Sequence, residues 1–206
     1  MLSIVNNCVH LWPTLSWVTS RREQILATAA DLFAARGFHG VSVVDLGAAC
    51  GISGPALYRH FSSKDAMLAE MLVSISEELL AVGRERVADA ADAGEALHAL
   101  VGWHIDFAIH NKALIVVQDR DWASLPDQAR EQVRSLQRRY VELWVDQLRT
   151  MHDGLTAKRA RAMAHATFGL LNSTPHSGML SEPEMRTMLE QMALGALGAA
   201  GSSSRP

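Results

Sequence analysis

Apolar residues recur along most of the chain at the three- and four-residue spacing of amphipathic helices. Between residues 21 and 36, Ile25, Ala29, Leu32 and Phe33 share one helical face, and Gly37 can end that helix in a left-handed conformation. The same pattern, interrupted at glycines and prolines, predicts further helices at residues 42–50, 54–61, 64–88, 94–110, 112–122, 126–152, 156–173 and 182–199. Alternation typical of strands is not sustained anywhere over five residues, so the predicted fold is all-α with about nine helices.

The composition narrows the class of protein. The 206 residues are 49% hydrophobic, enough for a core of ordinary size. An unbroken apolar run of about 18 residues is missing, so we expect no membrane contact. The two cysteines, Cys8 and Cys50, are too few for a disulfide framework, which suits a reducing cytoplasm and predicts a cytoplasmic localisation.

Two predicted helices near the N-terminus have the dimensions of a helix-turn-helix. They cover residues 42–50 and 54–61, and the turn between them is Gly51-Ile52-Ser53. Glycine suits the sharp turn because it adopts positive φ without strain. Helical hairpins with a glycine turn also occur in proteins that do not bind DNA, so the spacing alone leaves both readings open.

The amino-acid identities in this segment are more specific than the spacing of its helices. Residues 21–68 contain ILATAADLFAARGF from Ile25, SVVDL from Ser42, an A-x-x-G-I-S phrase ending at Ser53, LYRHF from Leu57 and SKDAML from Ser63. This segment closely resembles the DNA-binding domain of TetR-family transcriptional regulators. The resemblance implies a non-enzymatic, homodimeric regulator, most simply a repressor, that binds a palindromic DNA operator and is released by a small-molecule effector.

The resemblance also implies a domain organisation. Residues 21–66 form the helix-turn-helix domain, and residues 67–200 form a ligand-binding and dimerisation domain. Residues 1–20 are apolar but lack Lys, Arg and a small-x-small cleavage site, which disfavours a signal peptide and favours a flexible arm. Residues 201–206 are expected to be a disordered tail.

Resemblance and helix chemistry together predict the DNA contacts. The hydroxyl of Ser42 at a helix start can reach a phosphate, and small residues at the start of the second helix allow apolar contact with a thymine methyl. By resemblance Tyr58 and Lys64 contact phosphate, and Arg59 contacts phosphate or guanine. The alternative for Tyr58 is a buried aromatic. The predicted DNA-binding residues are Ser42, Ser53, Gly54, Pro55, Ala56, Tyr58, Arg59, His60 and Lys64. Many relatives carry Lys or Thr in place of Gly54 or Pro55, so direct readout is expected to be sparse.

The charge balance first argues against a nucleic-acid partner, because 19 Lys and Arg oppose 22 Asp and Glu and give a net charge of −3. The first 70 residues, however, contain five basic and five acidic residues and are neutral. Placement of charge matters more than the total. The count therefore predicts few Lys or Arg phosphate contacts in each half-site.

Candidate effector residues concentrate in the middle helices of the C-terminal half. Apolar walls with a few polar groups are typical of small-molecule sites, and equally of helical cores, so both readings stay open. The predicted set is Trp103, Phe107, Gln118, Trp122, Tyr140, Trp144, Phe168 and Asn172. By resemblance the last two helices form a four-helix dimer interface through Met163, Thr167, Leu171, Met185, Met188, Leu189 and Met192. The alternative is that these residues pack within one chain.

Two segments, FGLLNSTPHSG at 168–178 and VVQDRDWASLP at 116–126, resemble TetR regulators that sense acyl-coenzyme A thioesters. That subgroup often has tryptophans where Ser173 and Ser177 stand, which leaves the ligand open. If the likeness holds, Arg134, Arg138 or Arg139 could pair with coenzyme phosphates. The alternative is a solvated helix face.

Three rival functions remain. A multidrug sensor that controls an efflux pump would need acidic residues at its pocket, for which Asp106, Asp119 and Asp121 are candidates. An all-α enzyme or metal protein has little support, because HExxH and nucleophile-elbow motifs are missing, and we expect no catalytic residue, metal or cofactor. A coregulator that binds protein instead of DNA would tolerate Tyr58→Ala and Lys64→Ala.

Overall fold

The computed structural model describes residues 20–199, and this part of the chain is helical throughout, without a strand. The helices are α1 (Arg21–Arg36), α2 (Val43–Ala49), α3 (Gly54–Leu57), α4 (Lys64–Asp89), α5 (Ala93–His110), α6 (Lys112–Asp121), α7 (Asp127–Met151), α8 (Ala157–Leu171) and α9 (Glu182–Ala199). Short 3-10 turns, η1 (Trp122–Ser124) and η2 (Thr174–His176), follow α6 and α8. The all-α prediction is confirmed. The predicted N-terminal arm up to residue 19 and the predicted tail lie outside the described residues.

Local sequence signals set most helix starts. Ser20 and Ser42 precede α1 and α2, and each forms a capping box with the acidic residue three positions later, Glu23 or Asp45. Each hydroxyl accepts a hydrogen bond from a backbone N–H that the helix leaves unpaired, which stabilises the start by about 1 kcal/mol. Helix α3 is shorter than predicted. It ends at Leu57, and the chain continues to Phe61 in tighter turns in which Arg59 and His60 donate to carbonyls three residues back.

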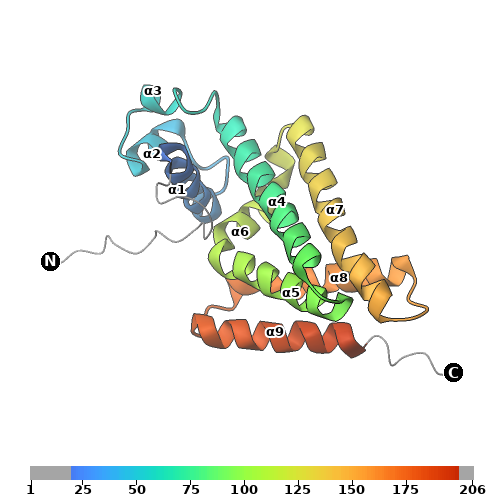
Figure 1. Ribbon diagram of the computed structural model, residues 1–206. Coiled ribbons are helices and arrows are strands. Elements are labelled where there is room, and N and C mark those ends of the chain that lie inside the picture. The colour runs from blue at the N-terminus through green and yellow to red at the C-terminus, as the bar shows by residue number, and fades with distance from the viewer. Residues whose placement is uncertain (1–19, 200–206) are drawn as a thin grey trace.

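The helices form two packed groups that share α4 (Figure 1). Helices α1 to α3 lie at one end, where Ile25, Phe33 and Leu46 are completely buried. Helices α5 to α9 lie at the other, with α9 along the outer edge. The first half of α4 contributes Leu72 to the first core, and its second half contributes Leu80 to the second. Helix α4 therefore connects the two groups as one continuous helix.

Helix α6 makes a further connection between the groups, as does the first part of α7 through Val133. It packs against α1, and His39 in the loop after α1 lies 2.9 Å from the Ser124 hydroxyl in η1, measured from Nε2 to Oγ. Within the described residues, no helix is both long and apolar enough to cross a membrane.

Candidate DNA-binding and effector sites

Helices α2 and α3 approach each other closely because two glycines permit it. Gly51 has a φ of 65°, a left-handed conformation that glycine adopts without strain. A Cβ on Gly47 would lie 2.8 Å from the carbonyl oxygen of Ile52, so a side chain there would push the turn away. The Ile52 N–H donates to the Gly47 carbonyl at 2.9 Å, which fixes the turn. The predicted helix-turn-helix is present.

The end of α3 and the turn that follows it separate buried from exposed side chains. Leu57 and Phe61 are 2% and 3% exposed and anchor the motif to the core. Tyr58 is 55% exposed, which excludes the buried-aromatic alternative, and Arg59 is also exposed. His60 is half-buried. Ser53 caps α3 by accepting the Ala56 N–H at 3.3 Å, and Pro55 occupies the first turn without loss of a hydrogen bond.

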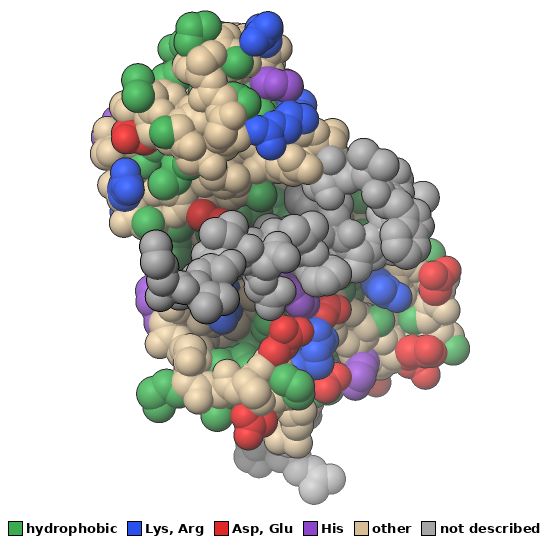
Figure 2. Space-filling model, turned by 90° about the vertical axis from the view of Figure 1, so that its left-hand side faces the viewer, with side chains coloured by type: hydrophobic (Ala, Val, Ile, Leu, Met, Phe, Trp, Pro, Cys, Tyr) green, Lys and Arg blue, Asp and Glu red, His purple; other side chains and the backbone are tan. Residues whose placement is uncertain are grey.

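Figure 2 shows the face of the molecule that carries this motif. Lys, Arg, His and apolar side chains are spread over its upper part, while most of the Asp and Glu side chains gather lower down, over the C-terminal helices. This arrangement accords with the neutral charge count of the first 70 residues. The end of the molecule that carries the helix-turn-helix is thus the less acidic one.

Two of the predicted phosphate contacts also have partners within the chain. The Ser42 Oγ accepts the Asp45 N–H at 3.1 Å and lies 2.5 Å from the Asp45 carboxylate, to which it donates. These bonds from Ser42 lower the pKa of Asp45. The Lys64 Nζ donates to the carbonyls of Phe38 and Val41 at 2.7 and 2.9 Å, and lies 4.3 Å from the centre of the Phe38 ring. Lys64 therefore fixes the loop between α1 and α2.

A positioning residue that the sequence analysis did not identify is Arg22. Its guanidinium donates to both oxygens of Glu70 on α4 and to the His60 carbonyl, and it lies 4.1 Å from the centre of the Phe61 ring. Arg22 thus joins α1, the end of the recognition segment and α4. Sequence offers no signal for it, because Glu70 lies 48 positions away.

Several of the predicted effector residues meet around one buried histidine. His104 of α5 is 4% exposed, and the rings of Phe107, Tyr140, Trp144 and Phe168 lie with their centres 4.7–6.1 Å from its own. These rings come from α5, α7 and α8. We call His104, Phe107, Tyr140, Trp144, Phe168 and Asn172 the aromatic cluster.

The polar groups of the aromatic cluster are neutral at physiological pH. Nδ1 of His104 lies 3.4 Å from the Tyr140 hydroxyl, and its Nε2 lies 3.2 Å from Oδ1 of Asn172. Burial lowers the pKa of His104 to about 4, against the weaker opposing effect of Asn172. Burial also raises the pKa of Tyr140. The cluster therefore holds hydrogen-bonding groups but no charge.

The remaining predicted effector residues lie elsewhere. Trp103 is half-buried and donates its indole N–H to the Leu79 carbonyl on α4 at 3.3 Å. Gln118 and Trp122 belong to α6 and η1, and Trp122 packs against the core of the DNA-binding end. Arg134 lies 5.6 Å from the centre of the Trp122 ring. The eight predicted residues thus do not line a single pocket.

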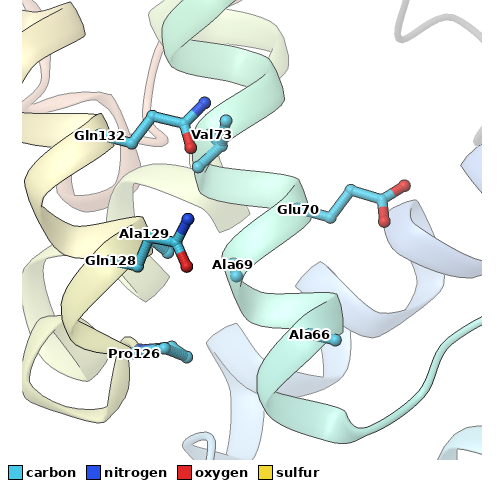
Figure 3. Close-up of a pocket in the computed structure, with 8 residues that line it drawn as sticks. All are labelled: Ala66, Ala69, Glu70, Val73, Pro126, Gln128, Ala129 and Gln132. Atoms are coloured by element: carbon cyan, nitrogen blue, oxygen red, sulfur yellow. The ribbon is translucent and has the colours of Figure 1, made fainter.

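An open groove runs between α4 and α7 beside the DNA-binding end (Figure 3). Its volume is about 360 Å³, and it is lined by Ala66, Ala69, Glu70, Val73, Pro126, Gln128, Ala129 and Gln132. Small apolar side chains form its floor, Gln128 and Gln132 project from α7 toward α4, and the Glu70 carboxylate points away from α7. No pattern in the sequence predicts this groove.

The other charged candidates are mostly paired or exposed. Asp106 accepts a hydrogen bond from Arg186, and Asp121, which is 6% exposed, lies 3.1 Å from Arg120. Asp119, Arg138 and Arg139 are exposed. Between residues 20 and 199, the structure holds no group of three or more His, Cys, Asp or Glu side chains arranged to bind a metal.

The residues predicted for a dimer interface divide between core and surface. Thr167, Leu171, Met185 and Leu189 are at most 4% exposed and pack within the chain itself. Met163 and Met188 are half-buried, and Met192 is 49% exposed. The outward faces of α8 and α9 mix small side chains with charged and polar ones, and the exposed small residues are Ala162, Ala166 and Gly169 on α8, and Gly195, Ala196 and Ala199 on α9.

Comparison with known proteins identifies the family to which this chain belongs. Residues 25–71 match the family model described as bacterial regulatory proteins, tetR family. Residues 90–197, just over half of the chain, match the tetracyclin repressor-like C-terminal domain. The chain belongs to the TetR family. The identification based on residues 21–68 is thereby confirmed, and it extends to the divergent C-terminal half.

Individual TetR-family proteins are similar over most of this chain. The transcriptional repressor KstR2 of Rhodococcus jostii is 33% identical over 129 residues, which are 62% of this chain and 63% of that protein. This chain therefore spans less than two thirds of that relative. The structure of the ketosteroid transcriptional regulator KstR2 of Mycobacterium tuberculosis superposes with a TM-score of 0.74 at 25% identity, over 86% of this chain and 95% of that one. The structure of AibR in complex with isovaleryl coenzyme A and operator DNA superposes with a TM-score of 0.68 at 21% identity. The match covers 84% of this chain and 97% of that one.

Proposed function

We propose that this protein is a homodimeric transcriptional repressor that binds a palindromic operator and leaves it when a small metabolite enters the C-terminal domain. The observation that carries the proposal is the exposure of Tyr58 and Arg59 directly beside the buried anchors Leu57 and Phe61. An aromatic and a cation held outward in the turn directly after a short helix are suited to contact a duplex. A repressor that binds DNA in this way acts in the cytoplasm, where its DNA lies.

The domain organisation of the proposed repressor follows the two packed groups. Residues 21–66 read the DNA, and residues 67–200 bind the effector and the second subunit. Gly54, Pro55 and Ala56 face the bases, while Ser42, Ser53, Tyr58, Arg59 and His60 serve the phosphate backbone. Lys64 acts mainly by fixing the loop after α1, because both of its hydrogen bonds go to that loop.

The proposed dimer uses the outward faces of α8 and α9. Small side chains on these faces let helices from two subunits approach closely, as four-helix interfaces require. Met192, Met188 and Met163 border these faces, whereas the buried members of the predicted set support them from within. A two-fold dimer places its recognition helices about 34–36 Å apart, in successive major grooves.

The proposed effector is a small apolar metabolite, with an acyl-coenzyme A thioester as the first candidate. The aromatic cluster offers rings and neutral hydrogen-bonding groups, which suit an uncharged acyl moiety. AibR accommodates isovaleryl coenzyme A and operator DNA within the same fold. A cationic drug is the second candidate, but Asp106 and Asp121, which could attract it, already pair with arginines.

A mobility-shift assay with the DNA upstream of the protein's own gene tests the proposed DNA binding. We expect a retarded complex at moderate salt in the presence of competitor DNA. Failure to retard the fragment would contradict the proposal. A thermal-shift screen of acyl-coenzyme A thioesters against cationic dyes then separates the two effector classes, since only the matching class raises the melting temperature.

A further inference from the structure

Val44, in the first turn of α2, is an exposed apolar residue that the DNA contacts predicted from sequence do not include. Its side chain is 75% exposed, while the neighbouring Val43 packs against the core. Among the large apolar side chains of the described residues, only Met179, at 95%, is more exposed. A single exposed valine is ordinary on a protein surface, so its meaning depends on where it lies.

Val44 follows Val43 in the first turn of α2, and Val43 lies beside the start of the recognition helix. A Cβ on Gly54, the first residue of α3, would lie 4.0 Å from Cγ1 of Val43. A Cβ on Gly47, one turn further along α2, would lie 3.3 Å from the backbone nitrogen of Gly54. The first turns of α2 and α3 are therefore neighbours. Val44 stands at the same end of the motif as Pro55, which is also exposed.

The surface around Val44 has little capacity for hydrogen bonds to bases. Gly54, Pro55 and Ala56 carry no polar side-chain atom, and the Ser53 hydroxyl caps α3. The Ser42 hydroxyl at the start of α2 is bonded to Asp45. An apolar surface of this kind complements one feature of the major groove, the C5-methyl group of thymine.

We propose that Val44 is a specificity-determining residue that contacts the C5-methyl group of a thymine in each operator half-site. This inference rests on the proposed DNA-binding function and extends it to the base that is read. Pro55 and Ala56 contact the adjacent base pair, also through apolar contact with a thymine methyl group. The preferred half-site therefore contains thymine opposite the start of α2.

The test begins with an operator selected from a random duplex pool by the full-length chain. Each thymine of one half-site is then replaced by deoxyuridine, which removes only the methyl group. Fluorescence anisotropy measures the Kd of each duplex. We expect at least one replacement to weaken binding about fourfold, the factor for one buried methyl group. In Val44→Ala the same replacement is expected to change the Kd by less than about twofold.

Val44 is exposed, so its substitution leaves the core intact, and circular dichroism verifies the fold. Met179→Ala is the matched control, because it removes an even more exposed apolar side chain far along the chain from the motif. In Met179→Ala, deoxyuridine should weaken binding by the same factor as in the unsubstituted protein. Equal affinity for thymine and uracil at every position, or an unchanged penalty in Val44→Ala, overturns the inference while DNA binding stands. A pool that yields no enriched sequence overturns the proposed function and this inference with it.

Discussion

Arg120 of α6 donates a hydrogen bond of 3.0 Å to the backbone carbonyl of Ala34, in the last turn of α1. The same guanidinium also donates to the Phe33 carbonyl, and the Asp121 carboxylate lies 3.1 Å from it. A cation at the C-terminal end of a helix is favourable, since the last carbonyls carry partial negative charge. Helix α6 follows α5, which carries His104, so Arg120 connects the region of the aromatic cluster with the DNA-binding end.

Replacement of Arg120 by glutamine should loosen this connection. It removes the charged hydrogen bonds to α1, and we expect the free energy of unfolding to fall by about 2 kcal/mol. Urea denaturation followed by circular dichroism measures the change. The control is Arg149→Gln, at an exposed position on α7, which should change stability by less than about 0.5 kcal/mol. Equal effects of the two substitutions would show that the Arg120 contact contributes nothing specific.

Lys64 and Arg59 should affect DNA binding in different ways. Lys64→Met keeps the aliphatic stem but removes the donor to Phe38 and Val41, so it should cost about 1–3 kcal/mol of stability and leave the salt dependence of binding unchanged. Arg59→Ala should leave stability unchanged and reduce the slope of log K against log salt by about 1 per subunit. Urea titrations and anisotropy at several salt concentrations give both quantities. A lower slope for Lys64→Met without loss of stability would instead identify Lys64 as a phosphate contact.

The buried His104 makes stability depend on pH. Its pKa is about 4 in the folded protein, compared with 6.5 for the free side chain. Between these values the unfolded chain binds a proton that the folded chain excludes, so the free energy of unfolding falls as the pH is lowered. The full loss across this window is about 3 kcal/mol.

His104→Gln should flatten this part of the stability profile, although it also lowers stability at neutral pH through lost packing. Urea denaturation at intervals between pH 7 and pH 4 gives the slopes. His165→Gln, at an exposed position on α8, is the control and should retain the wild-type slope. If the His104→Gln slope equalled that of the wild type, the histidine would not be buried in its neutral form.

Gly83 of α4 and Gly102 of α5 should respond to alanine with opposite signs. A Cβ on Gly83 would lie 2.7 Å from Cε2 of the buried Tyr140, so Gly83→Ala should destabilise the protein by about 1–2 kcal/mol through overpacking. A Cβ on Gly102 meets no atom within 4 Å. Gly102→Ala should therefore stabilise α5 by up to about 1 kcal/mol. Thermal or urea unfolding of the pair checks the signs, and stabilisation by Gly83→Ala would contradict the close α4–α7 contact.

The sequence predicted the helices well because their signals are local. Apolar spacing and caps such as Ser42 and Ser53 lie within a few residues of what they control. Lys64 and Arg120 could not be placed in this way, since their backbone partners lie 23 to 87 positions away. For the same reason, Lys64 was predicted only as a phosphate contact.

The predicted effector residues show a second limit. Aromatic composition indicated that Tyr140, Trp144 and Phe168 belong to one region, but sequence could not separate them from Trp122, which faces the other core. Both sides of α8 and α9 carry small or apolar residues, so periodicity did not distinguish the inward Leu171 and Leu189 from the outward face. Only the tertiary packing decides which side is buried.

The central claim is that two copies of this chain bind one operator through their helix-turn-helix motifs. The most direct test is a stoichiometric titration of a labelled duplex from the upstream DNA, at concentrations well above the Kd and with competitor DNA present. We expect a sharp saturation point at two chains per duplex, and its loss in the Tyr58→Ala, Arg59→Ala double variant. Saturation at one chain per duplex, or no binding above that of competitor DNA, would contradict it.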